Sequence, residues 1–280
     1  MTRLKPSLYL DLHSTSMVSR QTLRTLLFSP GIYVTLSLAL AVTMLLLRNT
    51  LGVINSGYAT VLFEPFVTPL LGMCILGGLY VALVATLSVT RERESGTLET
   101  LFYGPIRFHD YLLGKQVAHL VAYGGMTITF LLVCLVLAWL THLLLTPLLL
   151  AIAGLSLATT AALIGLALWI ASLVRTTRGT LLAFVGLIVV VLALQVGEAS
   201  LVSIVGSQQL LQFVFLRDSL IFLNQIVNWV SPVSYLFQGT DAAVRQSWGE
   251  WVMYFLIALL YGLVTLNLAA VQLRRKGVLR

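Results

Sequence analysis

The fold is decided by one apolar run, residues 116–174, which reads QVAHLVAYGGMTITFLLVCLVLAWLTHLLLTPLLLAIAGLSLATTAALIGLALWIASLV. These 59 residues include no Asp, Glu, Lys or Arg, and they lie between Lys115 and Arg175. At about 1.5 Å per residue, one continuous helix of this length would be nearly three times as long as the roughly 30 Å hydrocarbon core of a bilayer. The run must therefore turn back on itself, and we predict the corner at 141–147, where Thr, His and Pro interrupt the apolar pattern.

The composition of the whole chain agrees with a membrane protein. Of its 280 residues 59% are apolar and 10% are charged, whereas a globular domain has roughly 45–50% and about 25%. No stretch is long and polar enough to form a nucleotide-binding domain of its own. A soluble enzyme, a secreted disulfide scaffold and a self-contained ATP-driven machine are therefore excluded. Cys74 and Cys134 both lie in apolar runs, where buried free thiols are expected.

Charge-free runs bounded by charged residues predict an all-α integral membrane protein with six transmembrane helices. We expect a cytoplasmic tail at 1–29 and one membrane domain at 30–280. The predicted spans are 30–47, 65–90, 117–140, 147–174, 180–197 and 251–273.

The basic residues predict the orientation. With both termini in the cytoplasm, 14 Lys and Arg side chains lie inside, whereas Arg48, Arg217 and Arg245 lie outside. The acidic residues divide equally, so the formal charge is +9 inside and −2 outside, which sums to the net charge of +7. This asymmetry follows the positive-inside rule, so the basic character does not require a nucleic-acid partner.

Two segments flank the spans with amphipathic or polar sequence. Within 19–28, leucines share one helical face and Arg20 and Arg24 another, which predicts an interfacial helix; an ordinary basic flank is the alternative. The segment 198–250 holds two charge-free pieces rich in Ser, Gln and Asn. We interpret them as outer interfacial or re-entrant helices, although an eight-span arrangement also preserves the charge asymmetry.

The first large cytoplasmic loop, 91–115, carries both charge and an apolar stripe. Leu98, Leu101 and Phe102 recur at helical spacing beside Glu94 and Glu99. This pattern predicts a short helix at about 91–103 that docks in a groove of a partner, with apolar anchors for affinity and charges for register. The alternative is a solvated charged loop. The preceding span at 65–90 is long enough to project into the cytoplasm as a lever.

At these residues the sequence resembles the membrane subunits of ABC-2 type transporters. The similarity lies in Glu92-Arg93-Glu94-Ser95-Gly96-Thr97-Leu98-Glu99, in Pro105 and in Leu113-Gly114-Lys115. Supporting marks are Ser29-Pro30 before the first span, Pro69 in the second and Ser231-Pro232 before the last.

The resemblance implies a permease paired with a second permease copy, identical or not, and with a separate ABC ATPase subunit on the cytoplasmic face. ATP and Mg²⁺ would bind to that partner, and this chain would carry no cofactor and no active site. The loop would be the coupling helix, and the N-terminal helix the connecting helix. Residues implied in ATPase coupling are Glu92, Arg93, Glu94, Gly96, Thr97, Leu98, Glu99, Leu101, Phe102, Pro105, Gly114 and Lys115.

The expected function is ATP-driven transport, as an exporter, of an amphipathic or lipid-linked substrate across a plasma membrane, in keeping with a bacterial cell. No predicted span contains an Asp, Glu, Lys or Arg, which disfavours a secondary transporter or channel driven by an ion gradient. A membrane scaffold or a subunit of an integral membrane enzyme is a further alternative. The four histidines show no metal-ligand spacing, and Gly114-Lys115 is not part of a phosphate-binding loop.

Overall fold

The computed structural model describes residues 12–55, 65–98, 107–142, 146–205, 221–222, 225 and 227–275. In these ranges all the regular structure is helical. In chain order the helices are α1 (Leu12–Leu27), α2 (Pro30–Asn55), α3 (Val67–Glu94), α5 (Phe108–Thr141), α6 (Leu148–Leu173), α7 (Thr177–Val205), α9 (Pro232–Val244) and α10 (Trp248–Arg275).

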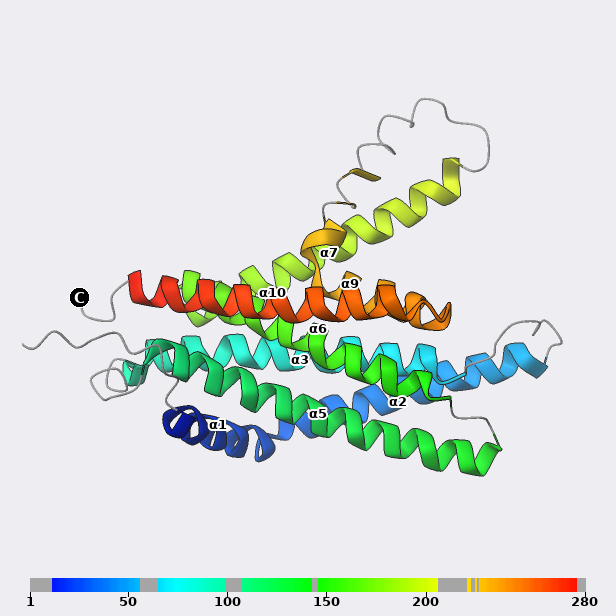
Figure 1. The fold of residues 1–280 in the computed structure, drawn as a ribbon, viewed down its shortest axis with the longest axis horizontal. Coiled ribbons are helices and arrows are strands. Elements are labelled where there is room, and N and C mark those ends of the chain that lie inside the picture. The colour runs from blue at the N-terminus through cyan, green and yellow to red at the C-terminus, as the bar shows by residue number, and fades with distance from the viewer. Residues whose placement is uncertain are drawn as a thin grey trace, which may run out of the picture.

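The helices α2, α3, α5, α6 and α10 run side by side as an elongated bundle (Figure 1). Each is long and apolar enough to cross a membrane. These five contain the predicted spans at 30–47, 117–140 and 251–273, and they contain those at 65–90 and 147–174 except for one or two residues at the ends. The sixth predicted span, 180–197, lies in α7, whose part Thr177–Val191 is also apolar. The chain is therefore a multi-pass, all-helical membrane protein.

The 59-residue run turns at its cluster of Thr, His and Pro residues. Helix α5 ends at Thr141, and His142 adopts a left-handed conformation with φ of 56° and donates its backbone N–H to the Ala138 carbonyl. Helix α6 begins directly after Pro147. Residues 143–145 lie outside the described part of the chain. The predicted corner and the observed helix ends thus coincide.

Small residues bring α6 and α10 into close contact at the centre of the molecule. The sequence around Ala161 and Gly165 of α6 faces Gly262 and Thr265 of α10. A Cβ atom on Gly165 would lie 2.4 Å from Thr265 Oγ1 and 2.8 Å from the carbonyl oxygen of Gly262. The two backbones can approach this closely because neither glycine carries a side chain.

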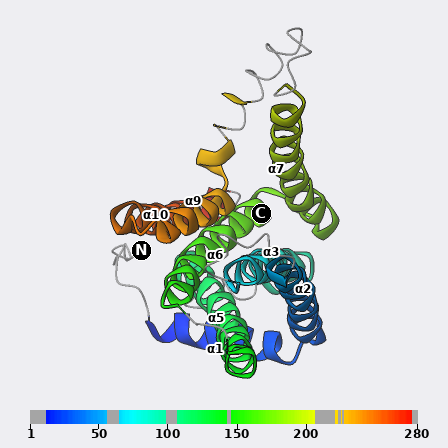
Figure 2. The same ribbon diagram turned by 90° about the vertical axis from the view of Figure 1, so that its right-hand side faces the viewer.

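The other described helices, α1, α7 and α9, differ from these five in direction or in length. Helix α1 extends further toward the N-terminus than the predicted 19–28, and it lies across α5 rather than along it (Figure 2). Helix α7 leaves the bundle at an angle (Figures 1 and 2). Helix α9 has 13 residues, fewer than a span requires, and packs between α6 and α10. Most of the predicted outer segment between 206 and 226 lies outside the described residues.

The close α6–α10 contact can be tested with one methyl group. Gly165→Ala should lower stability by about 1–3 kcal/mol, because the new Cβ meets backbone atoms that have to shift. Gly154→Ala on the same helix meets nothing within 4 Å and should be neutral or slightly stabilising. Thermal unfolding in detergent can be followed with a maleimide dye, which reacts with the buried Cys74 and Cys134 only as the fold opens. Equal melting temperatures for the two variants would contradict this packing.

Candidate coupling site

The charged residues that open the predicted loop are in fact the last turn of α3. The sequence pattern predicts that the span ends at 90 and that Arg91–Glu94 belong to a separate loop helix. This prediction is wrong, because α3 continues to Glu94. Ser95 then ends the helix, its N–H bonded to the Arg91 carbonyl at 2.9 Å. Gly96 follows with φ of +73° and open space around its Cα, so glycine is needed there for conformation and not for room.

Glu92 joins α3 to α5. One carboxylate oxygen lies 2.8 Å from Lys115 Nζ, and the other accepts a hydrogen bond from the Tyr111 hydroxyl. Lys115 is 1% exposed; its ammonium also donates to Ser88 Oγ at 3.1 Å and lies over the Tyr111 ring. Because an unpaired buried ammonium is strongly unfavourable, this pair holds the end of α3 against the first two turns of α5.

Arg93 and Glu94 join α3 to the corner between α6 and α7. The Arg93 guanidinium donates to the carbonyl of Val174, the C-cap residue of α6, at 3.4 Å. The Glu94 carboxylate accepts from the backbone N–H of Thr177, the first residue of α7, at 2.6 Å, and also from its hydroxyl. A cation at a helix C-terminus and an anion at an N-terminus are each favoured by the helix dipole.

Gly114 lets α1 lie against α5. A Cβ atom at this position would be 2.9 Å from both the Thr15 carbonyl oxygen and Val18 Cβ of α1. Helix α1 thus contacts α5 at Gly114, the residue before Lys115, and Lys115 is the residue of α5 that pairs with Glu92. The end of α3 is connected through these contacts to α5, α6 and α7, and through α5 to α1.

A family profile described as ABC-2 family transporter protein matches residues 15–278. The chain belongs to the ABC-2 transporter family. No curated protein matches it significantly. The match runs from within α1 to beyond the end of α10, so it includes the whole membrane bundle. The family consists of membrane transport subunits, in agreement with the apolar helices of this member.

In this ABC-2 transporter subunit, most of the residues predicted for coupling lie together at one end of the bundle. The contacts above account for Glu92, Arg93, Glu94, Gly114 and Lys115. The predicted residues Glu99, Leu101, Phe102 and Pro105 lie outside the described residues.

The turn after α3 combines a buried anchor with exposed polar groups. Leu98 is 1% exposed and belongs to the hydrophobic core, so its side chain is not available as the predicted docking anchor. Ser95 and Thr97 are exposed; their hydroxyls lie 2.9 Å apart, and each donates to the Glu92 carbonyl. The exposed surface of this turn is therefore polar.

Three partners at this site were not found from the sequence. Ser88 and Tyr111 form hydrogen bonds with the Glu92–Lys115 pair, and Thr177 donates hydrogen bonds to the Glu94 carboxylate. Extending α3 through Glu94 would have placed Ser88 and Glu92 one turn apart on the same face, and Tyr111 is likewise one turn from Lys115. No local pattern indicates the Thr177 contact, which joins residues 83 positions apart.

The Glu92–Lys115 pair predicts a non-additive pair of substitutions. Glu92→Gln should destabilise the fold by about 1–3 kcal/mol, less than for a fully buried pair since the Glu92 side chain is 35% exposed. Adding Lys115→Met should recover most of that loss, because no buried charge then lacks its partner. Thermal unfolding of the single and double variants measures the coupling.

The matched control is the exposed pair of Asp241 and Arg245. Asp241→Asn should change stability by no more than about 0.5 kcal/mol. Additive losses at Glu92 and Lys115, or an equal loss at Asp241, would show that the buried pair does not hold α3 to α5.

Proposed function

We propose that this chain is the transmembrane permease subunit of an ATP-binding cassette exporter for an amphipathic or lipid-linked substrate. A separate ABC ATPase subunit binds ATP and Mg²⁺ and docks on the turn that follows α3. Two permease copies, identical or different, form the pathway in the plasma membrane, with the termini of each in the cytoplasm. The family match supports the transport role, and the charge asymmetry supports the orientation.

The observation that carries the coupling proposal is the set of contacts at the end of α3. Glu92, Arg93 and Glu94 are consecutive, and they contact α5, the end of α6 and the start of α7, respectively. The ends of α3, α6 and α10 and the starts of α5 and α7 lie at the same end of the bundle (Figure 1). A push on the turn beyond Glu94 would thus act on several spanning helices at once.

The turn itself can transmit force because one end of it is fixed. Leu98 is buried in the core, while Ser95 and Thr97 bond to the last turn of α3. Helix α3 continues without a break from Val67 to Glu94, about 42 Å at 1.5 Å per residue. We propose that ATP-driven closure of the ATPase pair tilts α3 as a rigid lever and opens a path between two permeases.

The substrate class follows from the missing intramembrane charges. The predicted spans carry no Asp, Glu, Lys or Arg, so a bare ion would find no counter-charge along them. An amphipathic molecule, by contrast, can pass between apolar helices that also contain Thr, Ser and Tyr.

Site-specific cross-linking tests the docking of the ATPase. With cysteine at Ser95 or Thr97, a short bifunctional maleimide should join the chain to a subunit whose sequence contains a phosphate-binding loop and which hydrolyses ATP. The native cysteines are buried and should give little background. Gln246→Cys lies at the opposite end of the bundle, before α10, and is the control. ATPase adducts at Gln246→Cys only, or none at any site, would contradict the proposal.

Charge reversal at Glu94 tests the transmission of the stroke. Glu94→Lys places a cation at the start of α7, where the helix dipole disfavours it, and removes both bonds to Thr177. In proteoliposomes containing the ATPase, substrate moved per ATP hydrolysed should fall about tenfold, within the range of coupling free energies between sites. Glu250→Lys, in the first turn of α10, should leave this ratio unchanged. An unaltered ratio in Glu94→Lys would rule out transmission through α7.

A further inference from the structure

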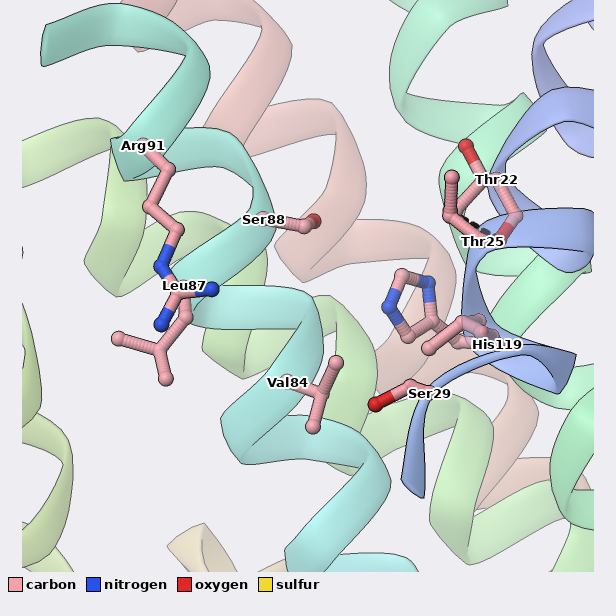
Figure 3. A pocket seen from close by; sticks show the side chains of 9 residues that line it. Thr22, Thr25, Ser29, Val84, Leu87, Ser88, Arg91 and His119 are labelled. Atoms are coloured by element: carbon pink, nitrogen blue, oxygen red, sulfur yellow. Dashed lines mark hydrogen bonds between the residues drawn. The ribbon is translucent and has the colours of Figure 1, made fainter. Parts of the chain in front are cut away.

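A cavity lined by both polar and apolar side chains lies between α1, α3 and α5, beside the contacts described above. Its volume is about 340 Å³, at the small end of the range for small-molecule sites. Figure 3 shows side chains from all three helices around it. The polar residues of its wall are Thr22, Thr25, Ser29, Ser88, Arg91 and His119.

His119 gives this cavity an unused hydrogen-bonding atom. The residue is 0% exposed, and its Nδ1 donates to the Lys115 carbonyl at 2.7 Å. Nε2 has no partner among the described residues, and the ring is directed into the space between α3 and α1 (Figure 3). In the neutral imidazole that donates from Nδ1, Nε2 is an acceptor, and a donor group of a ligand can satisfy it.

Arg91 gives the same cavity a positive charge. Its side chain is exposed, and it forms no ion pair within the described part of the chain. The neighbouring carboxylate of Glu92 is already bonded to Lys115 and Tyr111. Arg91 belongs to the same cavity wall as several hydroxyl groups, and a guanidinium is suited to a phosphate oxygen. The ligand should therefore carry both an anionic group and a hydrogen-bond donor.

The position of the cavity indicates that this ligand also has an apolar part. Ser29 directly precedes α2, the first spanning helix, and Arg91 lies in the last turn of α3. Leu27 and Phe28, next to Ser29, are exposed large apolar side chains, Phe28 at 79%. With the orientation given under Proposed function, the cavity lies at the level of the inner lipid headgroups.

We propose that this cavity binds the headgroup of a glycerophospholipid from the inner leaflet. The phosphate lies against Arg91 and the hydroxyl groups of α1, and an ammonium or hydroxyl of the headgroup donates to His119 Nε2. The acyl chains extend over the apolar surface at Leu27 and Phe28. The lipid then bridges α1 to α3 beside the coupling contacts. Only the assignment of this site to the inner leaflet rests on the orientation given under Proposed function.

Two lipids that differ only in their donors test the proposal. The purified full-length chain in detergent is titrated with dioleoylphosphatidylethanolamine or dioleoylphosphatidylcholine, and bound lipid is measured by native mass spectrometry. The ethanolamine headgroup has N–H donors and the choline headgroup has none, so the first should bind about tenfold more tightly. His119→Phe should abolish this preference, and Arg91→Gln should weaken both lipids about tenfold.

Controls separate the site from general lipid adhesion and from misfolding. Arg24→Gln and Gln21→Trp alter exposed positions of α1 outside the cavity wall and should change nothing. Thr25→Trp, also exposed, should fill the cavity and remove both lipids without touching the core. Melting temperatures show that each variant is folded.

Three results would overturn the proposal. The first is equal binding of the two lipids by the unaltered chain. The second is undiminished binding by Thr25→Trp. The third is equally tight binding of soluble glycerophosphoethanolamine, which would identify a water-soluble phosphoester as the ligand. The assay contains no ATPase, so its failure would leave the coupling proposal untouched.

Discussion

A buried ammonium is the constraint on which one end of this bundle depends. Lys115 is almost fully enclosed, and a lone charge in such surroundings is too unfavourable to persist. It is retained because Glu92, Ser88 and Tyr111 surround it with bonding partners. Those partners lie on α3 and α5, so satisfying one charge also fixes how two spanning helices meet. An apolar contact would fix the relative position of α3 and α5 less tightly, because it tolerates sliding that a hydrogen-bonded ion pair does not.

The sequence predicted those features that depend on composition and on breaks in the apolar pattern. The corner at 141–147 was predictable because Thr, His and Pro cluster there, near the middle of a run too long for one span. The connection of α3 to the following turn was not, because Arg91–Glu94 are charged and charge usually marks the end of a span. In the structure Glu92, Arg93 and Glu94 bond to other helices, and α3 continues past the point where hydropathy would end it.

Side-chain partnerships were less accessible than helix positions. Glu94 and Thr177 lie 83 residues apart, and their contact depends on how α3 packs beside the α6–α7 corner. Leu98 is a second case in which the partner of a side chain could not be predicted. Its helical spacing with Leu101 and Phe102 indicated an apolar docking face, yet the structure buries Leu98 in the chain's own core. Apolar periodicity identifies a face that will be covered, but it does not say whether the cover is internal or a partner.

The connections at the end of α3 differ in kind, and this difference bears on how a stroke would spread. The contact with α5 is an ion pair whose ammonium is enclosed by other side chains, whereas the contacts with α7 are made at exposed positions at a helix end. Water can replace the second kind at little cost, but replacing the first kind would expose the buried ammonium. Helices α3 and α5 should therefore move together, while α7, which already diverges from the bundle, can change its angle. Movement between α3 and α7 is thus the least costly way for this chain to convert the proposed push on the turn after α3 into a change between helices.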